Sequence, residues 1–327
     1  MNVGFFVRHF TERGTEVAVY DYARYNEEIL QNKSYIICFS EQGQRQVGFP
    51  TMRHSYEKFR ARFPIITIDT MDEMSSNIEE YNLSFFYTLT HGSGNDIYQF
   101  NNKTLWKNCK TIKHCVFHTD FQEGDYYFSI GEHNNTKYQT NIPIIPHIVD
   151  LPDIHENLRD ELHIPSDALV IGRHGSAEAF DIQYAKNAVM QYINQDENLY
   201  FVFMNTTQFF THPRIIYLNM NVDCDYKTKF INTCDAMLHA RGHGETFGLS
   251  VAEFSIRNKP IITCKCGDLE HIKLLGDKAI LYDSAESLVD IFKNLRTTIQ
   301  SHTDWNCYRD YSPQKVMNLF KTLIFDL

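Results

Sequence analysis

Residues 239–263 have the sequence HARGHGETFGLSVAEFSIRNKPIIT, and this stretch is the most informative about the fold. Glu245 and Glu253 are eight positions apart, which on one continuous α-helix would leave them about 80° apart around the axis. Because glycines lie on both sides of Glu245, we predict a loop that carries Glu245 and opens near Leu249 into a helix that carries Glu253. Such a helix N-terminus presents backbone N–H groups and a positive dipole end, which favours phosphate binding.

Short apolar runs alternate with helix-length segments on both sides of this stretch. Continuous apolar runs are typical of buried parallel strands, and their alternation with helices predicts βα units. The sequence therefore predicts an α/β protein with parallel sheets. The strand candidates lie at 3–7, 34–39, 63–68, 83–89 and 114–118, and then at 168–173, 199–204, 214–219, 235–240, 259–264 and 278–282.

The segment 141–153, NIPIIPHIVDLPD, contains three prolines and predicts a linker. With 327 residues the chain is long enough for two domains. We predict a first domain over 1–145 and a second over 146–307. The last helix, within 308–327, either packs in the core of the second domain or returns to the first.

The first predicted helix follows the turn at residues 13–15 and has the sequence EVAVYDYARYNEEIL. Helical spacing places Val17, Tyr20, Ala23 and Arg24 on one stripe, which is mostly apolar. We expect this stripe to face the sheet.

Four segments resemble the retaining transferases of glycosyltransferase family 4, which have the GT-B fold of two Rossmann-like domains facing across a cleft. Residues 245–253, followed by Asn258–Ile262, are similar to the family's E-x7-E signature and the strand after it. Ile171–Arg173 resembles a strand that ends in Gly-Arg, and residues 145–150 resemble the segment that starts the second domain. Residues 266–270 resemble a loop with an acidic residue at Glu270, which is equally well explained as charge at a helix N-terminus.

The resemblance implies roles for individual residues. Glu245 would face the hydroxyls of the donor sugar, Glu253 would accept hydrogen bonds from the ribose, and Arg173 would neutralise the donor diphosphate. The family's lysine after this arginine is replaced by Ala179, and the next lysine is Lys186. The implied catalytic residues are Glu245, His118 and Arg173, and the implied donor-binding residues are Glu253, Arg173, Thr246, Phe247, Gly248, Leu249, Gly14 and Lys186.

The first domain matches the family only in outline. Gly14, in Arg13-Gly14-Thr15-Glu16, falls where the family has a glycine-rich loop at the start of the first helix. His118 is expected to close a strand on the cleft side, near the 6-position of the donor sugar. A histidine that only satisfies local polar groups is an equally good interpretation.

Three short motifs carry little weight. Asp223-Cys224-Asp225 is a DxD motif of the kind that holds Mn²⁺ or Mg²⁺ in other transferases, but such triplets arise often by chance. His239 and His243 have zinc-like spacing without the glutamate of HExxH. Gly92-Ser93-Gly94 is better explained as a turn than as a phosphate loop.

Composition excludes several classes of protein. A net charge of −10 argues against a protein that coats nucleic acid or an anionic membrane. Eight scattered cysteines without a CxxC pair indicate neither a disulfide framework nor a four-cysteine zinc site. No apolar run is long enough for a membrane span. We expect a soluble cytoplasmic protein, and a homodimer is compatible with the sequence.

The function implied by the resemblance is retaining transfer of a hexose from a nucleotide-diphosphate sugar to a hydroxyl of a glycan or glycoconjugate. Family frequency favours GDP-mannose as the donor, and no metal or other cofactor is expected. The alternatives are a GT-B nucleotide-sugar epimerase or phosphorylase, a glycoside hydrolase with paired carboxylates, and a non-catalytic nucleotide-sugar binder.

Overall fold

The computed structural model describes residues 1–11, 13–47, 51–94 and 97–326, and the chain divides into two compact units. Unit 1 comprises Met1–Ile148 and Tyr311–Leu327, and unit 2 comprises Val149–Asp310. The proline-containing segment 141–153 spans the point where unit 1 passes into unit 2.

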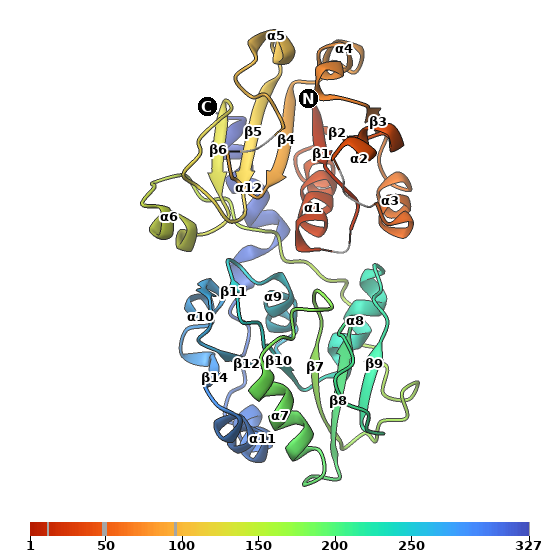
Figure 1. Cartoon of the computed structure of the whole chain (residues 1–327), viewed down its shortest axis with the longest axis vertical. Helices are drawn as coiled ribbons and strands as arrows, with labels where there is room; N and C mark the ends of the chain where they lie inside the picture. Colours follow the sequence, from red (N-terminus) through yellow and green to blue (C-terminus); the bar gives the residue numbers. More distant parts are fainter. Residues whose placement is uncertain (12, 48–50, 95–96, 327) are drawn as a thin grey trace. The chain divides into compact units, whose positions relative to one another are not determined.

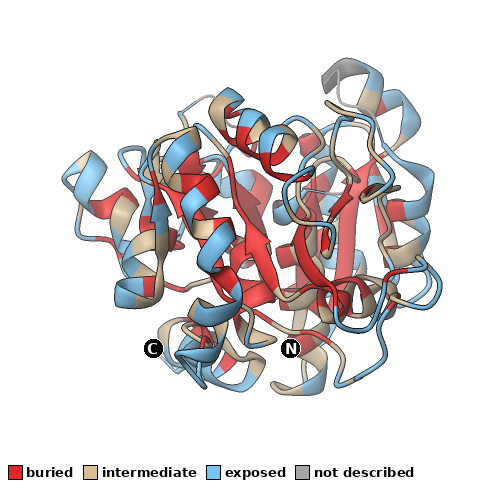
Figure 2. Cartoon of the chain, turned by 90° about the horizontal axis from the view of Figure 1, so that it is seen from below, coloured by how far each residue is buried: buried red, intermediate tan, exposed pale blue. Residues whose placement is uncertain are grey.

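Unit 1 is built on a six-stranded parallel sheet with the order β3-β2-β1-β4-β5-β6 (Figure 1). Its strands β1, β2 and β4 are almost wholly buried, as continuous apolar runs predict. Figure 2 shows buried strands beside helices that keep exposed faces. The strands are β1 (Asn2–Val7), β2 (Lys33–Phe39), β3 (Ile65–Ile68), β4 (Phe85–Thr90), β5 (Lys110–Cys115) and β6 (Tyr126–Ser129), and the helices are α1 (Gly14–Glu28), α2 (Glu41–Val47), α3 (Arg53–Arg60), the 3-10 turn η1 (Met71–Glu73), α4 (Met74–Glu80), α5 (Lys103–Trp106), α6 (Glu132–Tyr138) and α12 (Pro313–Ile324).

The buried face of α1 differs from the predicted stripe. Of the predicted stripe only Ala23 is buried, whereas Val17, Tyr20 and Arg24 are half-buried. Tyr22 and Asn26, which were not in the stripe, are inside. Asn26 can be buried because its amide group donates a hydrogen bond to Ser34 Oγ at 2.9 Å. The buried face is otherwise largely apolar, with Ala18, Val19, Tyr22, Ala23 and Tyr25 inside.

The C-terminal helix α12 packs in unit 1. Phe320 lies 5.4 Å from Tyr22 of α1 and 5.9 Å from Tyr87 of β4, measured between ring centroids. Just beyond the helix, the Phe325 ring meets Phe85 at 4.9 Å. The C-terminal helix therefore packs in the same hydrophobic core as α1 and β4.

Unit 2 repeats the topology of unit 1, with the order β14-β12-β10-β7-β8-β9 in a second six-stranded parallel sheet. Counted along the chain, each sheet has the strand order 3-2-1-4-5-6 of doubly wound folds. The predicted α/β class with parallel sheets is thus confirmed. The strands are β7 (Leu169–Arg173), β8 (Leu199–Met204), β9 (Ile215–Leu218), β10 (Ala236–Leu238), β12 (Ile261–Cys264), β14 (Ile280–Tyr282) and a short separate pair, β11 (Gly244–Glu245) with β13 (Asp268–Leu269), and the helices are α7 (Gln183–Tyr192), α8 (Cys224–Thr233), α9 (Leu249–Ile256), α10 (Glu270–Leu275) and α11 (Ala285–Gln300), with 3-10 turns η2 (Gly276–Lys278) and η3 (Arg309–Tyr311).

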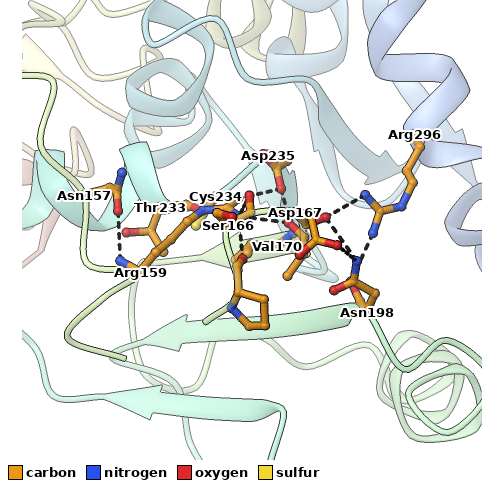
Figure 3. Close-up of polar contacts among 12 residues, drawn as sticks. Asn157, Arg159, Ser166, Asp167, Val170, Asn198, Thr233, Cys234, Asp235 and Arg296 are labelled. Atoms are coloured by element: carbon orange, nitrogen blue, oxygen red, sulfur yellow. Dashed lines mark hydrogen bonds and ion pairs between the residues drawn. The ribbon is translucent and has the colours of Figure 1, made fainter. Parts of the chain in front are cut away.

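A hydrogen-bond network around Arg159 fastens the chain at the N-terminal end of β7 (Figure 3). The guanidinium of Arg159 donates to the Asp235 carboxylate at 2.9 Å and to several backbone carbonyls, including that of Thr233 at 3.2 Å. Asp235 in turn accepts from the backbone N–H of Val170 at 2.8 Å. This end of the sheet is therefore closed by the chain's own polar groups.

The structure also bears on the cysteines and on membrane-spanning helices. All eight cysteines are free thiols. In the part of the chain that the structure describes, no helix is long and apolar enough to cross a membrane.

Candidate functional site

The residues of the predicted E-x7-E stretch lie at the topological switch point of the unit 2 sheet. There β7, the first strand, pairs with β10, the fourth, so the loops after them leave in opposite directions. Doubly wound sheets bind ligands at this position, beyond the carboxyl ends of the strands. The loop after β7 starts with His174, and the loop after β10 starts with His239 and carries Glu245.

The local structure of this loop matches the prediction. Glu245 lies in the short strand β11, and the helix α9 begins at Leu249 behind an N-cap glycine, Gly248, with a left-handed φ of 81°. No side chain caps the helix start. Uncapped N–H groups at a helix N-terminus suit an anionic ligand.

Glycines allow the loop to pack against its neighbours. Gly244 has a φ of 63°, and a Cβ there would overlap the carbonyl oxygens of Asp268 and Cys266. This close approach lets β11 pair with β13, which directly precedes α10 and Glu270. Glu270 is buried at the first position of α10, in agreement with its interpretation as helix N-terminal charge.

Glu245 is held by two cationic or potentially cationic side chains. Its Oε1 lies 3.3 Å from His239 Nε2, and its Oε2 accepts from Arg241 Nη1 at 2.8 Å. Burial alone would raise the pKa of Glu245, but the hydrogen bond and charge of His239 together with Arg241 lower this pKa to about 2. The carboxylate is therefore ionised, with 16% of its side chain exposed.

His239 is itself fixed by a buried chain of hydrogen bonds. Its Nδ1 is 2.9 Å from Thr263 Oγ1, which is 3.0 Å from His271 Nε2. Tyr282 donates its hydroxyl to the His239 carbonyl at 2.8 Å. Burial lowers the pKa of His271 to about 3, so that ring is neutral at physiological pH. The chain therefore orients the imidazole that faces Glu245.

The second glutamate, Glu253, lies in a separate buried cluster. It is 5% exposed, its Oε1 accepts from Lys227 Nζ of α8, and its Oε2 is 2.9 Å from His174 Nε2. Burial raises the pKa of Glu253, but the charges of Lys227 and His174 outweigh it and lower the pKa to about 2. The His174 ring stacks on Phe254 of α9 at 5.7 Å, which fixes it beside Glu253.

Arg173 ends β7 and is 4% exposed. Its guanidinium donates to the backbone carbonyls of Asn205 and Ser176 and to the hydroxyl of Thr206, at 2.6–3.0 Å. Burial lowers the pKa of Arg173 to about 10, which leaves it charged at neutral pH. Arg173 thus ties the loops after β7 and β8 together just behind the switch point.

The other donor-binding residues predicted in unit 2 lie in two places. The residues 246–249 continue the Glu245 loop into α9: Thr246 and Phe247 are buried, and the Phe247 carbonyl accepts from Tyr308 at 2.9 Å. Lys186 instead lies on α7, and its Nζ sits 5.9 Å from the centroid of the Phe209 ring. The structure brings residues 245–249 together at the switch point, whereas the contact it shows for Lys186 is an aromatic one.

Two predicted residues belong to unit 1. Gly14 is exposed at the first position of α1. His118 was expected to close a strand, and this is wrong: β5 ends at Cys115, and His118 lies in the loop beyond it. Its ring centroid is 4.6 Å from that of His91 and 4.8 Å from that of Tyr138, and 34% of the His118 side chain is exposed.

The short motifs have structural roles. Asp223 is the N-cap of α8 and accepts from the backbone N–H of Asp225 at 2.9 Å. Gly92 has a φ of 95° and packs against the carbonyl of His118. Among the residues described, no group of three His, Cys, Asp or Glu side chains is placed to hold a metal ion.

A small hollow lies beside Arg173, beyond the ends of β8 and β9. Its volume is about 200 Å³, smaller than the roughly 300–1,000 Å³ of pockets that enclose whole ligands. It is lined by Ala177, Asn205, Thr206, Thr207, Tyr217, Leu218, Asn219 and Met220.

Sequence reasoning missed several residues of the site. Lys227 and His174 have no motif that links them to Glu253, because the fold alone brings α8 and the end of β7 beside α9. Arg241 is four positions before Glu245, but that spacing indicates contact only on a helix, and this segment is a loop. Thr263 lies in a strand that was predicted, β12, yet its contact with two histidines was not predicted.

No protein-family model matches this chain, and no curated protein matches it significantly in sequence. Solved structures do match its fold. They include Alr3699/HepE of Anabaena in complex with UDP and glucose (TM-score 0.70, 12% identity, 98% of each chain covered) and a glycosyltransferase of Rickettsia africae (TM-score 0.67, 15% identity, 100% of this chain and 99% of the other). A UDP-N-acetylglucosamine 2-epimerase assigned in Listeria monocytogenes also matches (TM-score 0.63, 13% identity, 100% and 97% covered).

These matches span nearly the whole of both chains, and both units have the same doubly wound topology. The chain therefore has the GT-B fold that the resemblance implied. At these identities the likeness establishes the fold, and the chemistry must be argued from the site.

Proposed function

We propose that this protein is a glycosyltransferase that transfers a hexose from a nucleotide-diphosphate sugar to a hydroxyl of a glycan or glycoconjugate. The observation that carries the proposal is the ionised Glu245 at the switch point, directly before the uncapped N-terminus of α9. A carboxylate that stays charged suits recognition of sugar hydroxyls, and the helix end beside it suits a diphosphate. The same chain segment thus offers complementary groups to both halves of a sugar nucleotide.

The charge distribution also fits the chemistry of sugar transfer. Breaking the bond between sugar and phosphate develops positive charge on the sugar and negative charge on the departing diphosphate. In our proposal Glu245 faces the sugar, while Arg173 and the start of α9 stabilise the diphosphate. Arg173 acts there through its charge from behind the loops it holds, since its N–H groups donate to three protein acceptors.

The finer assignments follow from the family resemblance. They are a retaining course in which the leaving phosphate takes the proton of the acceptor, no requirement for a metal, and roles for Glu253 at the ribose and His118 near the sugar. GDP-mannose is the donor predicted from that resemblance. HepE was solved with UDP-glucose, so uridine nucleotides are the first alternative to examine.

The test is acceptor-dependent release of nucleoside diphosphate from GDP-mannose, UDP-glucose, UDP-N-acetylglucosamine and ADP-glucose, with EDTA present. We expect one donor to be used, and Glu245→Gln to lower the rate by about 10²-fold or more, the size typical for a group that stabilises transition-state charge. Thermal unfolding of the variant must show an intact fold. The control is Glu286→Gln, a glutamate in the first turn of α11.

Different outcomes would replace the proposal. Conversion of the donor without any acceptor would favour the epimerase, which the fold also accommodates. Binding of a donor without turnover would indicate a nucleotide-sugar-binding protein. Activity that appears only with added Mn²⁺ would contradict metal independence.

A further inference from the structure

Three cationic side chains on the elements around the switch point of unit 2 are committed to other contacts. Arg173 is 4% exposed and donates to the neighbouring loops. Lys227 is paired with Glu253 inside the unit. Lys186 lies over the Phe209 ring.

Arg241, in the loop between β10 and β11, is a further cation at this switch point. Its side chain is 33% exposed and pairs with Glu245, whose Oε2 accepts from Arg241 Nη1 at 2.8 Å. A guanidinium presents five N–H groups in a planar fork. This contact involves one of its terminal nitrogens, so the fork has donors left for a second anion.

The backbone around Arg241 is held in place on both sides. The Gly242 N–H donates to Asp181 Oδ1 at 2.7 Å, and the Asp181 N–H donates to the Ala240 carbonyl at 3.1 Å. The Gly244 N–H donates to the Arg241 carbonyl at 3.0 Å. The backbone at Arg241 is therefore held by hydrogen bonds, and the guanidinium can change its position by rotation about the side-chain torsions.

Arg241 is one of two guanidiniums close to Glu245. Glu245 faces Arg241 and His239, and Arg173 lies close enough for the Arg241 charge to act on it. The Asp181 carboxylate also acts on Arg173, so the two guanidiniums lie near two carboxylates. A diphosphate carries more charge than a carboxylate and accepts a guanidinium fork well, so it competes effectively for Arg241.

We propose that Arg241 contacts the donor diphosphate directly, exchanging the Glu245 carboxylate for phosphate oxygens when the donor binds, so that Glu245 is released to a sugar hydroxyl. The inference rests on the proposed function and names the residue that replaces the lysine missing at Ala179. It also makes donor binding the step that prepares Glu245.

The test is calorimetric titration at 0.15 M salt with UDP and GDP, and with uridine and guanosine as probes without phosphate. Arg241→Gln is expected to weaken the nucleoside diphosphate that binds by roughly 10- to 100-fold, the usual range for loss of a charge-assisted hydrogen bond. Binding of the matching nucleoside should stay within about twofold. Arg241→Lys should recover part of the loss, because it restores the charge without the fork.

The matched control is Lys265→Gln, which removes the same charge from an exposed residue between Cys264 and Cys266. It should leave the affinity for the diphosphate nearly unchanged. If Arg241→Gln binds the diphosphate as tightly as the original chain, or weakens the nucleoside equally, the assignment of Arg241 is overturned while the proposed function stands. If the original chain binds no nucleoside diphosphate, both are overturned.

Discussion

The switch points of the two units share a backbone design and differ in electrostatics. In each sheet the loop after the fourth strand packs against the loop after the fifth through a glycine of positive φ. In unit 1 Gly92 meets the carbonyl of His118, and in unit 2 Gly244 meets those of Cys266 and Asp268. The common topology therefore imposes the same close approach in both units.

Two largely buried carboxyl groups, Glu16 after the first strand of unit 1 and Glu245 after the fourth strand of unit 2, have pKa values shifted in opposite directions. Glu16, in the first turn of α1, is buried next to His9 and accepts from Thr11 and Thr15, and its burial raises its pKa. Burial would also raise the pKa of Glu245, yet His239 and Arg241 lower it to about 2. The comparison teaches that fold alone does not make a charged site, since the partners of each carboxylate decide its ionisation.

The largest effect should come from removing the cation beside a buried carboxylate in unit 2. Lys227→Met leaves Glu253 with His174 as its remaining partner, and we expect the free energy of unfolding to fall by about 3–5 kcal/mol. Urea denaturation measures this. The control, Lys293→Met, removes an exposed lysine paired with Asp290 and should change stability by less than about 0.5 kcal/mol. A small effect of Lys227→Met would mean that Glu253 does not depend on this charge.

The glycine contacts should be comparable in the two units. Gly92→Ala and Gly244→Ala each place a methyl group against a backbone carbonyl at a positive φ, and we expect each to cost about 2–3 kcal/mol. Gly242→Ala is the control, because its nearest neighbour is the Asp181 carboxylate at 3.4 Å, an ordinary contact. Thermal unfolding measures both variants. If either glycine can be replaced by alanine without loss of stability, the close backbone approach is not equally required in the two units.

The smallest effects are those of replacing Glu16 and Glu245 by glutamine, and the two changes in the free energy of unfolding should have opposite signs. Because the pKa of Glu16 is raised in the folded state, its ionisation opposes folding at pH 7, so Glu16→Gln should raise the free energy of unfolding there. This gain should disappear below the ordinary glutamate pKa of 4.5. Glu245→Gln should instead lower the free energy of unfolding at pH 7, by about 1–2 kcal/mol.

The pH dependence of the second variant follows from the lowered pKa. The stabilisation by Glu245 is present above pH 4.5 and is lost as the pH falls towards about 2. The original chain and Glu245→Gln should therefore become equally stable at low pH. Urea titrations between pH 2 and pH 7 measure both curves, and the same sign for both variants at pH 7 would refute the electrostatic contrast.

Much of the fold could be predicted from local sequence patterns. Continuous apolar runs such as 199–204 became buried strands because parallel strands are covered on both faces. The helix predicted to open near Leu249 begins there, since Gly248 can adopt the left-handed conformation that starts it. The stripe predicted for α1 contained the buried Ala23 but missed the apolar residues around it, whereas the burial of Asn26 could not be predicted, because its contact with Ser34 depends on the strand β2 packed against it.

The candidate site was predictable only in part. Glu245 could be found because its neighbours in the chain, the glycines and the helix start, are also its neighbours in space. Lys227 and His174 could not be found, because they come from different elements and meet Glu253 only after folding. The expectations for Arg173 and Lys186 concern ligands, and they remain predictions for the binding experiments.

The sequence by itself therefore determined the α/β class, the proline-rich passage between the two units and the glutamate loop, because each depends on residues close together in the chain. The tertiary structure decided which cations neutralise which carboxylate. Lys227 could face Glu253 only when the fold placed α8 beside α9, and Arg241 could face Glu245 only through the folded shape of the loop that carries both. Coulombic and hydrogen-bonding interactions act over a few ångströms in space, whatever the separation along the chain.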